Sequence, residues 1–430
     1  MKILAVAVCI SFLPVVVEST ACADCTTTYD GAIKDATDEV KCTAAKKYIT
    51  CLETDLAACA AVDLKAKGGV ADKAITDLGD KCTVAATSTC HCERTAIKAD
   101  VTADNAAVCS NAQTAITCLR GTVDAGCSDS RTVAATAYAG QITSKCTGGA
   151  TATCTCEITH TKATVPADTD QCTAAKALVT CLQDTTDAGC SESRKEVGTF
   201  AKTKTDKGAC ATTDVCDCEV GYGIADIADA TKQCTAIKEK LTCLANKAND
   251  GCDGSSAWMV GMNARKVLAD VTNCDKTDTC TCETDHAKSD LSTDEKKCTE
   301  TKKKIKCLGG KNSTGCDGSS NLMVGVASRK YLAGVTGCDK TATCTCETDY
   351  ATADLSTKDN QCSKANTAKE CLQKITATET GCDGTSSPTD VIANYAQPLI
   401  DEYCGAAASL TGVGFTVGIL VMLLEITRRI

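Results

Sequence analysis

The chain of 430 residues contains 37 cysteines, carries a net charge of −10 and has only 3% aromatic residues. This cysteine content is close to that of a disulfide scaffold, and the scarcity of large rings means that each domain needs covalent support. The negative charge argues against a nucleic-acid partner. The one basic run, Lys302 to Lys304, is interpreted as a solvated helix face.

Residues 1–21 have the pattern of a secretory signal peptide. The second residue is basic, Ile3–Val17 form an apolar segment too short for a membrane span, and Ser19 and Ala21 fit the small-residue cleavage positions. Removal of this segment would start the mature chain at Cys22 in an oxidising compartment. We therefore expect a secreted or surface protein whose cysteines form disulfides.

The central part of the chain repeats one cysteine pattern six times. A segment C-x8-C-L recurs every 62 to 67 residues, and its first cysteines are Cys42, Cys109, Cys172, Cys234, Cys298 and Cys362. If each repeat begins at a closely spaced cysteine pair, six repeats of six cysteines use 36 of the 37, and only Cys9 remains. The predicted repeats cover 22–85, 86–149, 150–212, 213–276, 277–340 and 341–404.

Each repeat is predicted to be a small bundle of about three helices. In the C-x8-C-L segment, apolar residues 3, 7 and 10 positions after the first cysteine form one helical stripe, such as Ile237, Leu241 and Leu244. A second helical stretch follows at 256–268, and a less regular one follows the cysteine pair at 222–231. Because alternating patterns are rare, we expect an all-α fold of six tandem, disulfide-stapled units in an elongated array.

Two local signals mark helix ends. Ser292 and Glu295 match a capping box ahead of the fifth C-x8-C-L segment. In repeats two to six a glycine precedes the next cysteine, which predicts a helix stop or a turn. These glycines are Gly126, Gly189, Gly251, Gly315 and Gly381.

Six cysteines allow 15 pairings, and geometry reduces this number. The two cysteines of C-x8-C lie about 13 Å apart along one helix and on opposite faces, so they cannot bond to each other. The adjacent CxC pair is also too close to bond to itself. Ten patterns remain, all joining different segments of a repeat. In repeat four the six cysteines are Cys216, Cys218, Cys234, Cys243, Cys252 and Cys274.

The CxC motifs resemble thiolate ligand sets for metals, and His91 lies within one of them. The signal segment and the even cysteine count favour disulfides, so we predict no metal and no cofactor. His160 and His286 follow their cysteine pairs by four residues, where three other repeats have tyrosine, and we interpret them as packing residues. With three histidines in the chain and no phosphate-binding loop, no catalytic residue is predicted.

Two further features concern modification and anchoring. Asn312 begins a glycosylation sequon on a predicted loop. Residues 405–424 carry no charge and are long enough to span a bilayer, and the arginines beyond them fit a stop-transfer end. The alternative is a GPI signal with lipid attachment at Gly405 or Ala406. In both cases we expect the segment 405–430 to act as a membrane anchor.

These features predict a non-catalytic, cysteine-rich ectodomain on the extracellular face of the plasma membrane, for adhesion, recognition or coat formation. The expected partner is an extracellular protein or glycan, because a repeated rigid unit lets several weak contacts act together. The alternative is a multi-headed protease inhibitor, secreted or anchored, since six-cysteine modules in tandem are common among inhibitors. Against it, the chain has only 4 prolines for extended binding loops.

Overall fold

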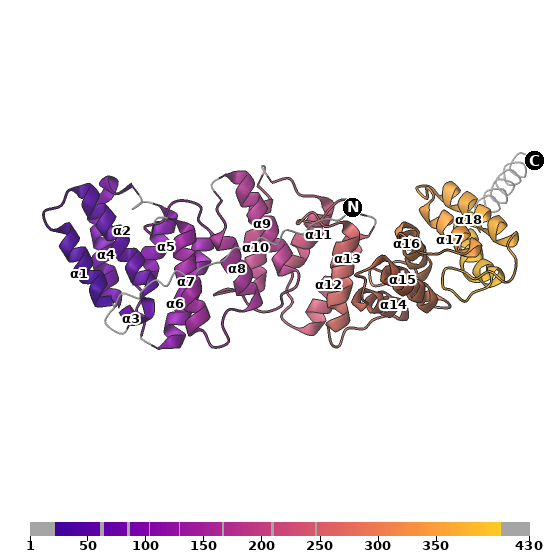
Figure 1. The fold of residues 1–430 in the computed structure, drawn as a ribbon, viewed down its shortest axis with the longest axis horizontal. Coiled ribbons are helices and arrows are strands. Elements are labelled where there is room, and N and C mark those ends of the chain that lie inside the picture. Colours follow the sequence, from indigo (N-terminus) through magenta and orange to yellow (C-terminus); the bar gives the residue numbers. More distant parts are fainter. Residues whose placement is uncertain are drawn as a thin grey trace, which may run out of the picture. The chain divides into compact units, whose positions relative to one another are not determined.

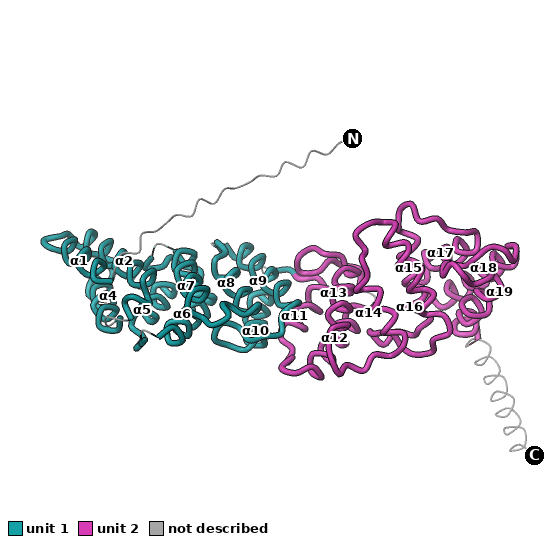
Figure 2. Tube along the Cα trace, turned by 60° about the horizontal axis from the view of Figure 1, so that its bottom comes forward, with its two compact units in different colours: residues 1–211 teal, residues 212–430 magenta. Residues whose placement is uncertain are grey.

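The computed structural model describes most of residues 22–405, with gaps at 61–63, 84–86, 103, 129, 166, 208–209 and 246. The predicted signal segment 1–21 and residues 406–430, most of the predicted anchor, lie outside the described residues. The described chain consists of helices and loops without a strand, which confirms the all-α fold class. It divides into two compact units, residues 1–211 and 212–430 (Figure 2).

The N-terminal unit contains repeats one to three (Figure 1). In repeat one the elements are α1 (Cys22–Ile33), α2 (Asp38–Thr54), the short α3 (Leu56–Ala60), α4 (Leu64–Leu78) and the 3-10 turn η1 (Gly79–Lys81). Repeats two and three have three helices each: α5 (Ser88–Ile97), α6 (Asn105–Arg120), α7 (Arg131–Lys145), α8 (Ala152–Lys162), α9 (Asp168–Leu182) and α10 (Arg194–Thr205).

The C-terminal unit contains repeats four to six. Their helices are α11 (Asp214–Gly223), α12 (Ala230–Leu244), α13 (Ala257–Asp270), α14 (Asp278–Lys288), α15 (Asp294–Leu308), α16 (Asn321–Gly334), α17 (Ala342–Thr352), α18 (Lys358–Gln373) and α19 (Pro388–Val391). After α19 the chain makes a π-helical turn, η3 (Ile392–Ala396), and continues as helix over 397–405.

About three helices per repeat were predicted, and this holds, but the placement of the least regular helix was wrong. The CxC pair lies inside the first helix of each of repeats two to six, and 224–229 form a loop where a helix was expected. The helix starts early because a threonine caps it. In repeat four the side chain of Thr213 accepts the amide N–H of Cys216. The other threonines in this role are Thr87, Thr151, Thr277 and Thr341.

The predicted capping box of repeat five does not form, and the N-cap lies one residue later than predicted. Thr293, not Ser292, is the N-cap, and its side chain accepts the amide N–H of Lys296. The amide N–H of Ser292 instead donates to the Asp290 carboxylate over 2.9 Å. Both residue types favour this position, so the local sequence does not separate them.

All six repeats share one disulfide pattern, which joins the first cysteine to the fifth, the second to the fourth and the third to the sixth. In repeat four the bridges are Cys216–Cys252, Cys218–Cys243 and Cys234–Cys274. The first two tie the opening helix to the end of the second helix and to the loop after it. The third ties the start of the second helix to the segment that follows the third helix. This is one of the ten patterns that helix geometry left open.

We expect loss of the Cys234–Cys274 bridge to lower the free energy of unfolding of repeat four by about 4 kcal/mol, because the loop that it closes spans 40 residues. The test variant carries Cys234→Ala and Cys274→Ala. Trp258 in α13 is the only tryptophan of the chain, so urea unfolding followed by its fluorescence reports on this repeat.

The matched control removes the equivalent bridge of repeat two, Cys109–Cys146, which lies in the N-terminal unit. This control should leave the Trp258 transition in place. An equal displacement of that transition by both variants would contradict the division into two compact units.

Candidate functional site at the junctions between repeats

A buried glutamate directly follows the CxC pair in repeats two to six. Its carboxylate accepts the amide N–H of the fifth cysteine of the same repeat, as from Cys252 N to Glu219 Oε2 over 2.6 Å. These side chains are at most 3% exposed. They are Glu93, Glu157, Glu219, Glu283 and Glu347. The carboxylate thus fixes the loop that carries the fifth cysteine.

This carboxylate explains the glycine before the fifth cysteine. A Cβ atom on Gly251 would lie 2.7 Å from Glu219 Oε2 and 2.9 Å from Val260 Cγ2, which is too close for either atom. Gly251 does begin a turn, since its carbonyl accepts the amide N–H of Gly254. Of the two predicted alternatives, the turn is present, whereas α12 ends earlier, at Leu244. The φ of Gly251 is not positive, so the close carboxylate is what requires glycine.

At three junctions within the compact units, an arginine of the preceding repeat pairs with the buried glutamate. Arg265 of α13 lies 2.8 Å from Glu283 of α14. The other two pairs are Arg329–Glu347 and Arg120–Glu157. Removal of one partner from such a pair leaves a buried charge without compensation, at a cost of about 3–5 kcal/mol. The pairs therefore hold neighbouring repeats in one arrangement.

The junction of repeats one and two brings two buried carboxyl groups together instead. Glu53 of α2 accepts the hydroxyl of Tyr138 over 3.0 Å, and Glu93 accepts the amide N–H groups of Cys127 and Ser128. Burial raises the pKa of Glu93 to about 7. Burial, followed by the charge of Glu93, raises the pKa of Glu53 well above its usual value. This junction therefore favours protonated carboxyl groups.

The junction of repeats four and five encloses a cavity of about 320 Å³. Trp258 of α13 and Tyr331 of α16 form part of its wall and stack, with ring centroids 4.4 Å apart and planes 10° from parallel. Arg265, His286 and Lys304 also line it. Its volume lies at the lower end of the range for small-molecule sites. Among the described residues, this cavity is the strongest candidate for a binding site.

The three histidines have different surroundings. His160 and His286 are 7% and 5% exposed, which agrees with their interpretation as packing residues, whereas His91 is exposed. His160 Nδ1 lies 3.1 Å from the Ala174 carbonyl, and His286 Nε2 lies 3.3 Å from Thr301 Oγ1. Burial lowers the pKa of both to about 4, so both are neutral at pH 7.

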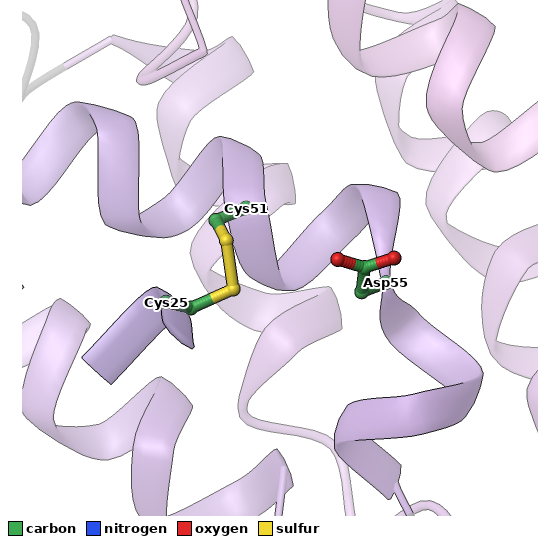
Figure 3. A group of neighbouring side chains, drawn as sticks. All are labelled: Cys25, Cys51 and Asp55. Atoms are coloured by element: carbon green, nitrogen blue, oxygen red, sulfur yellow. A yellow bond between two sulfur atoms is a disulfide. The ribbon is translucent and has the colours of Figure 1, made fainter. Parts of the chain in front are cut away.

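Within the described part of the chain, two side-chain groups have the composition of a metal site, but in each group the two sulfur atoms are already bonded to each other. Figure 3 shows the Cys25–Cys51 disulfide close to the Asp55 carboxylate. In the second group Glu93 lies beside the Cys90–Cys127 disulfide. Thiolates are the strong ligands of such sites, and a disulfide supplies none. Metal binding at either group would require reduction first.

The other predicted site residues lie apart from the cavity. Asn312 is exposed in the loop between α15 and α16. Gly405 is helical and is the last described residue, and Ala406 lies outside the described residues. Among the helices that the structure describes, none combines the length and apolar character needed to cross a bilayer.

Sequence reasoning missed the buried glutamates and their arginine partners. A signal for the glutamates was present, because five of the six repeats read CxC-Glu. The sequence contains no comparable signal for the arginines, because they do not share one position of the repeat. Arg265 and Arg329 lie at matching positions of the third helix, but Arg120 lies in the second helix of its repeat.

No protein-family model, curated protein or solved structure matches this chain. The fold and the bridges alone define its class: an all-α protein of repeated, disulfide-stapled helical units. Eighteen intramolecular disulfides indicate a protein of the secretory pathway or the extracellular space.

The first prediction for the junctions concerns glycine. We expect Gly251→Ala to destabilise repeat four by about 1–3 kcal/mol, because the added Cβ displaces the Glu219 carboxylate. The control is Gly221→Ala in α11, where nothing lies within 4 Å of the new atom, and it should stabilise the repeat by about 0.5–1 kcal/mol. Urea unfolding followed by Trp258 fluorescence measures both. The same loss of stability in both variants would contradict the steric role of Gly251.

The second prediction for the junctions concerns the pH dependence of stability. Glu93 binds its proton more tightly in the folded state, with a pKa of about 7 against 4.5, so folding is favoured at low pH and this contribution is lost as pH rises through that interval. Glu53→Gln should stabilise the N-terminal unit at pH 7 and weaken the pH dependence. Samples are equilibrated in urea at each pH. A hydrogen-exchange pulse at one fixed pH then measures the unfolded fraction of the peptide 131–145.

The control for this experiment is Glu39→Gln on the exposed face of α2, which should leave the pH dependence unchanged. A unit that becomes more stable between pH 4.5 and pH 7, with Glu53 intact, would contradict the buried-carboxyl interpretation.

Proposed function

We propose that the protein is a non-catalytic ectodomain array that serves adhesion, recognition or coat formation at the cell surface, through an extracellular protein or glycan partner. The observation that carries the proposal is the disulfide framework, because the same three bridges recur in all six repeats. Such a framework resists unfolding in the oxidising surroundings of a cell surface.

The distribution of recurring and varying residues supports display rather than a repeated active site. The cysteines, capping threonines and buried glutamates recur, and they form the internal framework. The large apolar side chains that are exposed differ between repeats: Val40 and Val70 in repeat one, Val123 and Val133 in repeat two, and Trp258 and Met259 in repeat four. One chain therefore presents several different surfaces, and contacts made together raise the overall affinity.

Attachment to a membrane is part of this proposal and rests on the uncharged sequence 405–424. Both forms of attachment, a single span or a GPI lipid at Gly405 or Ala406, place the repeats outside the cell. The exposed position of Asn312 leaves its side chain accessible to glycosylation in the secretory pathway.

We expect the full chain, expressed in secretory cells, to be labelled by a membrane-impermeant reagent and to lose residues 1–21. Its intact mass with and without reduction should differ by 36 hydrogen atoms, two for each of the eighteen disulfides. Release by a phosphatidylinositol-specific phospholipase would identify the GPI form, and retention would identify the single span. The matched control ends at residue 404 and should appear in the medium with the same bridges.

Beads coated densely with the secreted form should adhere to cells. The same form added free in solution should not compete with the beads, because a single chain binds more weakly than many chains together. Intracellular retention of the full chain with free thiols would contradict the surface proposal. Inhibition of a serine or cysteine protease by micromolar protein would contradict the adhesive role and favour the multi-headed inhibitor.

A further inference from the structure

Two core positions that lie close together take different residues along the array. One follows the CxC pair by four residues, and the other follows the first cysteine of C-x8-C by six. In repeat one they are Tyr29 and Tyr48, which stack with centroids 4.8 Å apart. In repeats two, three and six the second position is also apolar and buried: Ala115, Leu178 and Ala368. A lysine at this position therefore stands where the fold otherwise places a core side chain.

Repeats four and five have lysine at this position, but only repeat four supplies an aromatic partner. The ammonium group of Lys240 lies 5.4 Å from the ring centre of Tyr222, a cation–π contact. In repeat five Lys304 instead neighbours the neutral His286 and lines the cavity. The interpretation of Lys302 to Lys304 as a solvated helix face was wrong for Lys304, which is half-buried. Among the described residues it forms no hydrogen bond and no ion pair. A half-buried cation of this kind lacks an acceptor.

The cavity exists because two aromatic residues of the next junction are absent from this one. Between repeats five and six, the centre of the Tyr395 ring lies 3.8 Å from the Arg329 guanidinium. The Tyr350 ring is perpendicular to the Tyr395 ring, with centroids 6.0 Å apart. Four positions after the matching valine, repeat five has Ser328 where repeat six has Tyr395. His286 likewise replaces Tyr350. The space beside Arg265 is therefore left open, with Ser328 in its wall.

The hydrogen bonds fix which nitrogen of His286 is an acceptor. Thr301 donates its hydroxyl proton to the Lys297 carbonyl over 2.6 Å. Thr301 Oγ1 must therefore accept from His286 Nε2, which carries the proton of the neutral ring. His286 Nδ1 is then an acceptor, and it is buried without a hydrogen-bond partner. The residues that line the cavity thus include one cationic donor, Lys304, and one neutral acceptor, on His286.

The acidic groups of the cavity already have partners. Glu283 accepts the amide N–H of Cys316 and pairs with Arg265, and Asp317 accepts the amide N–H of Ser319 and lies 3.5 Å from Arg265. The charges of Glu283 and Asp317 also act on Lys304, but Lys304 donates no hydrogen bond to either, so among the described residues of the cavity it is the cation left to donate to a ligand. Leu241, Leu244, Met262, Met323 and the Trp258–Tyr331 stack supply apolar wall.

We propose that this cavity binds a small carboxylate that carries a hydroxyl or N–H group and an aromatic or branched apolar body. The carboxylate pairs with Lys304, the hydroxyl or N–H donates to His286 Nδ1, and the apolar body lies against the methionines and the Trp258–Tyr331 stack. This binding site goes beyond the proposed surface role and does not depend on it, since no cell-surface partner takes part.

The test uses the full chain with its disulfides intact and 3-phenyllactate as the probe. Trp258 is the only tryptophan and lines the cavity, so its emission should change saturably on binding. Calorimetry gives an affinity that does not depend on the fluorophore. We expect 3-phenylpropanoate, which lacks the hydroxyl, and the neutral amide of 3-phenyllactate each to bind at least tenfold more weakly.

Two variants test the assigned contacts. Lys304→Met should weaken binding of 3-phenyllactate at least tenfold, and this position accepts apolar side chains in other repeats. Ser328→Tyr should abolish binding, because it restores the residue that fills the junction of repeats five and six. The control Lys303→Met removes the same charge from an exposed position on α15 and should bind normally. Thermal unfolding shows that each variant is folded.

Three results would overturn the proposal. One is the absence of saturable binding of 3-phenyllactate. Another is unchanged affinity in folded Lys304→Met. The third is tighter binding of 2-phenylethylamine than of the acid, which would assign the cavity to a cation held by Glu283 and Asp317.

Discussion

The glutamate that follows each CxC pair accepts a buried hydrogen bond, and the arrangement of the repeat depends on this interaction. It lies on the first helix, binds the amide of the fifth cysteine, and so holds that cysteine where it bonds to the first, as Glu283 does for Cys316 and Cys280. The Glu283 carboxylate also lies against the preceding repeat, where Arg265 pairs with it. A disulfide fixes which segments meet, but a single covalent bond leaves rotation about it. The buried, charge-assisted hydrogen bond removes that freedom.

Burying a carboxylate is energetically unfavourable, and the junctions compensate for it in different ways. An arginine compensates Glu157, Glu283 and Glu347, and it brings donors for the second carboxylate oxygen. Between repeats one and two, Glu93 faces Glu53 instead, and the raised pKa values show that the neutral forms are preferred there. One framework thus supports junctions that respond differently to pH. The variation lies in side chains at the junctions, while the bridges stay the same.

The sequence was sufficient for the helical class, and for good physical reason. The period of Ile237, Leu241 and Leu244 reports one buried helix face, and the alternative pairings of CxC and C-x8-C fail on distance alone. Local pattern did not locate the opening helix, because threonine-rich segments have low helix propensity and the cap at Thr213 acts through one hydrogen bond. The choice among ten disulfide patterns depends on how three helices pack, which a single repeat of sequence does not specify.

The cavity could not be predicted from local sequence patterns, for a different reason. Its walls come from five helices of two repeats, and no short motif joins Lys304 to Trp258. Comparison of repeats with one another does contain a signal. Lys304 stands at a position that is Leu178 or Ala368 elsewhere, and a charged residue in a core position of one repeat has to be compensated by something. Repeats four and five are nearly identical in sequence around Gly251 and Gly315. What distinguishes their shared junction is that Ser328 and His286 replace the two aromatic rings that fill the next junction.

In an array whose bridges fix the backbone of every repeat, such a replacement does not collapse the junction. It leaves a lined space, and so the disulfide framework that stabilises the repeats also allows one junction to acquire a binding site without a change of fold.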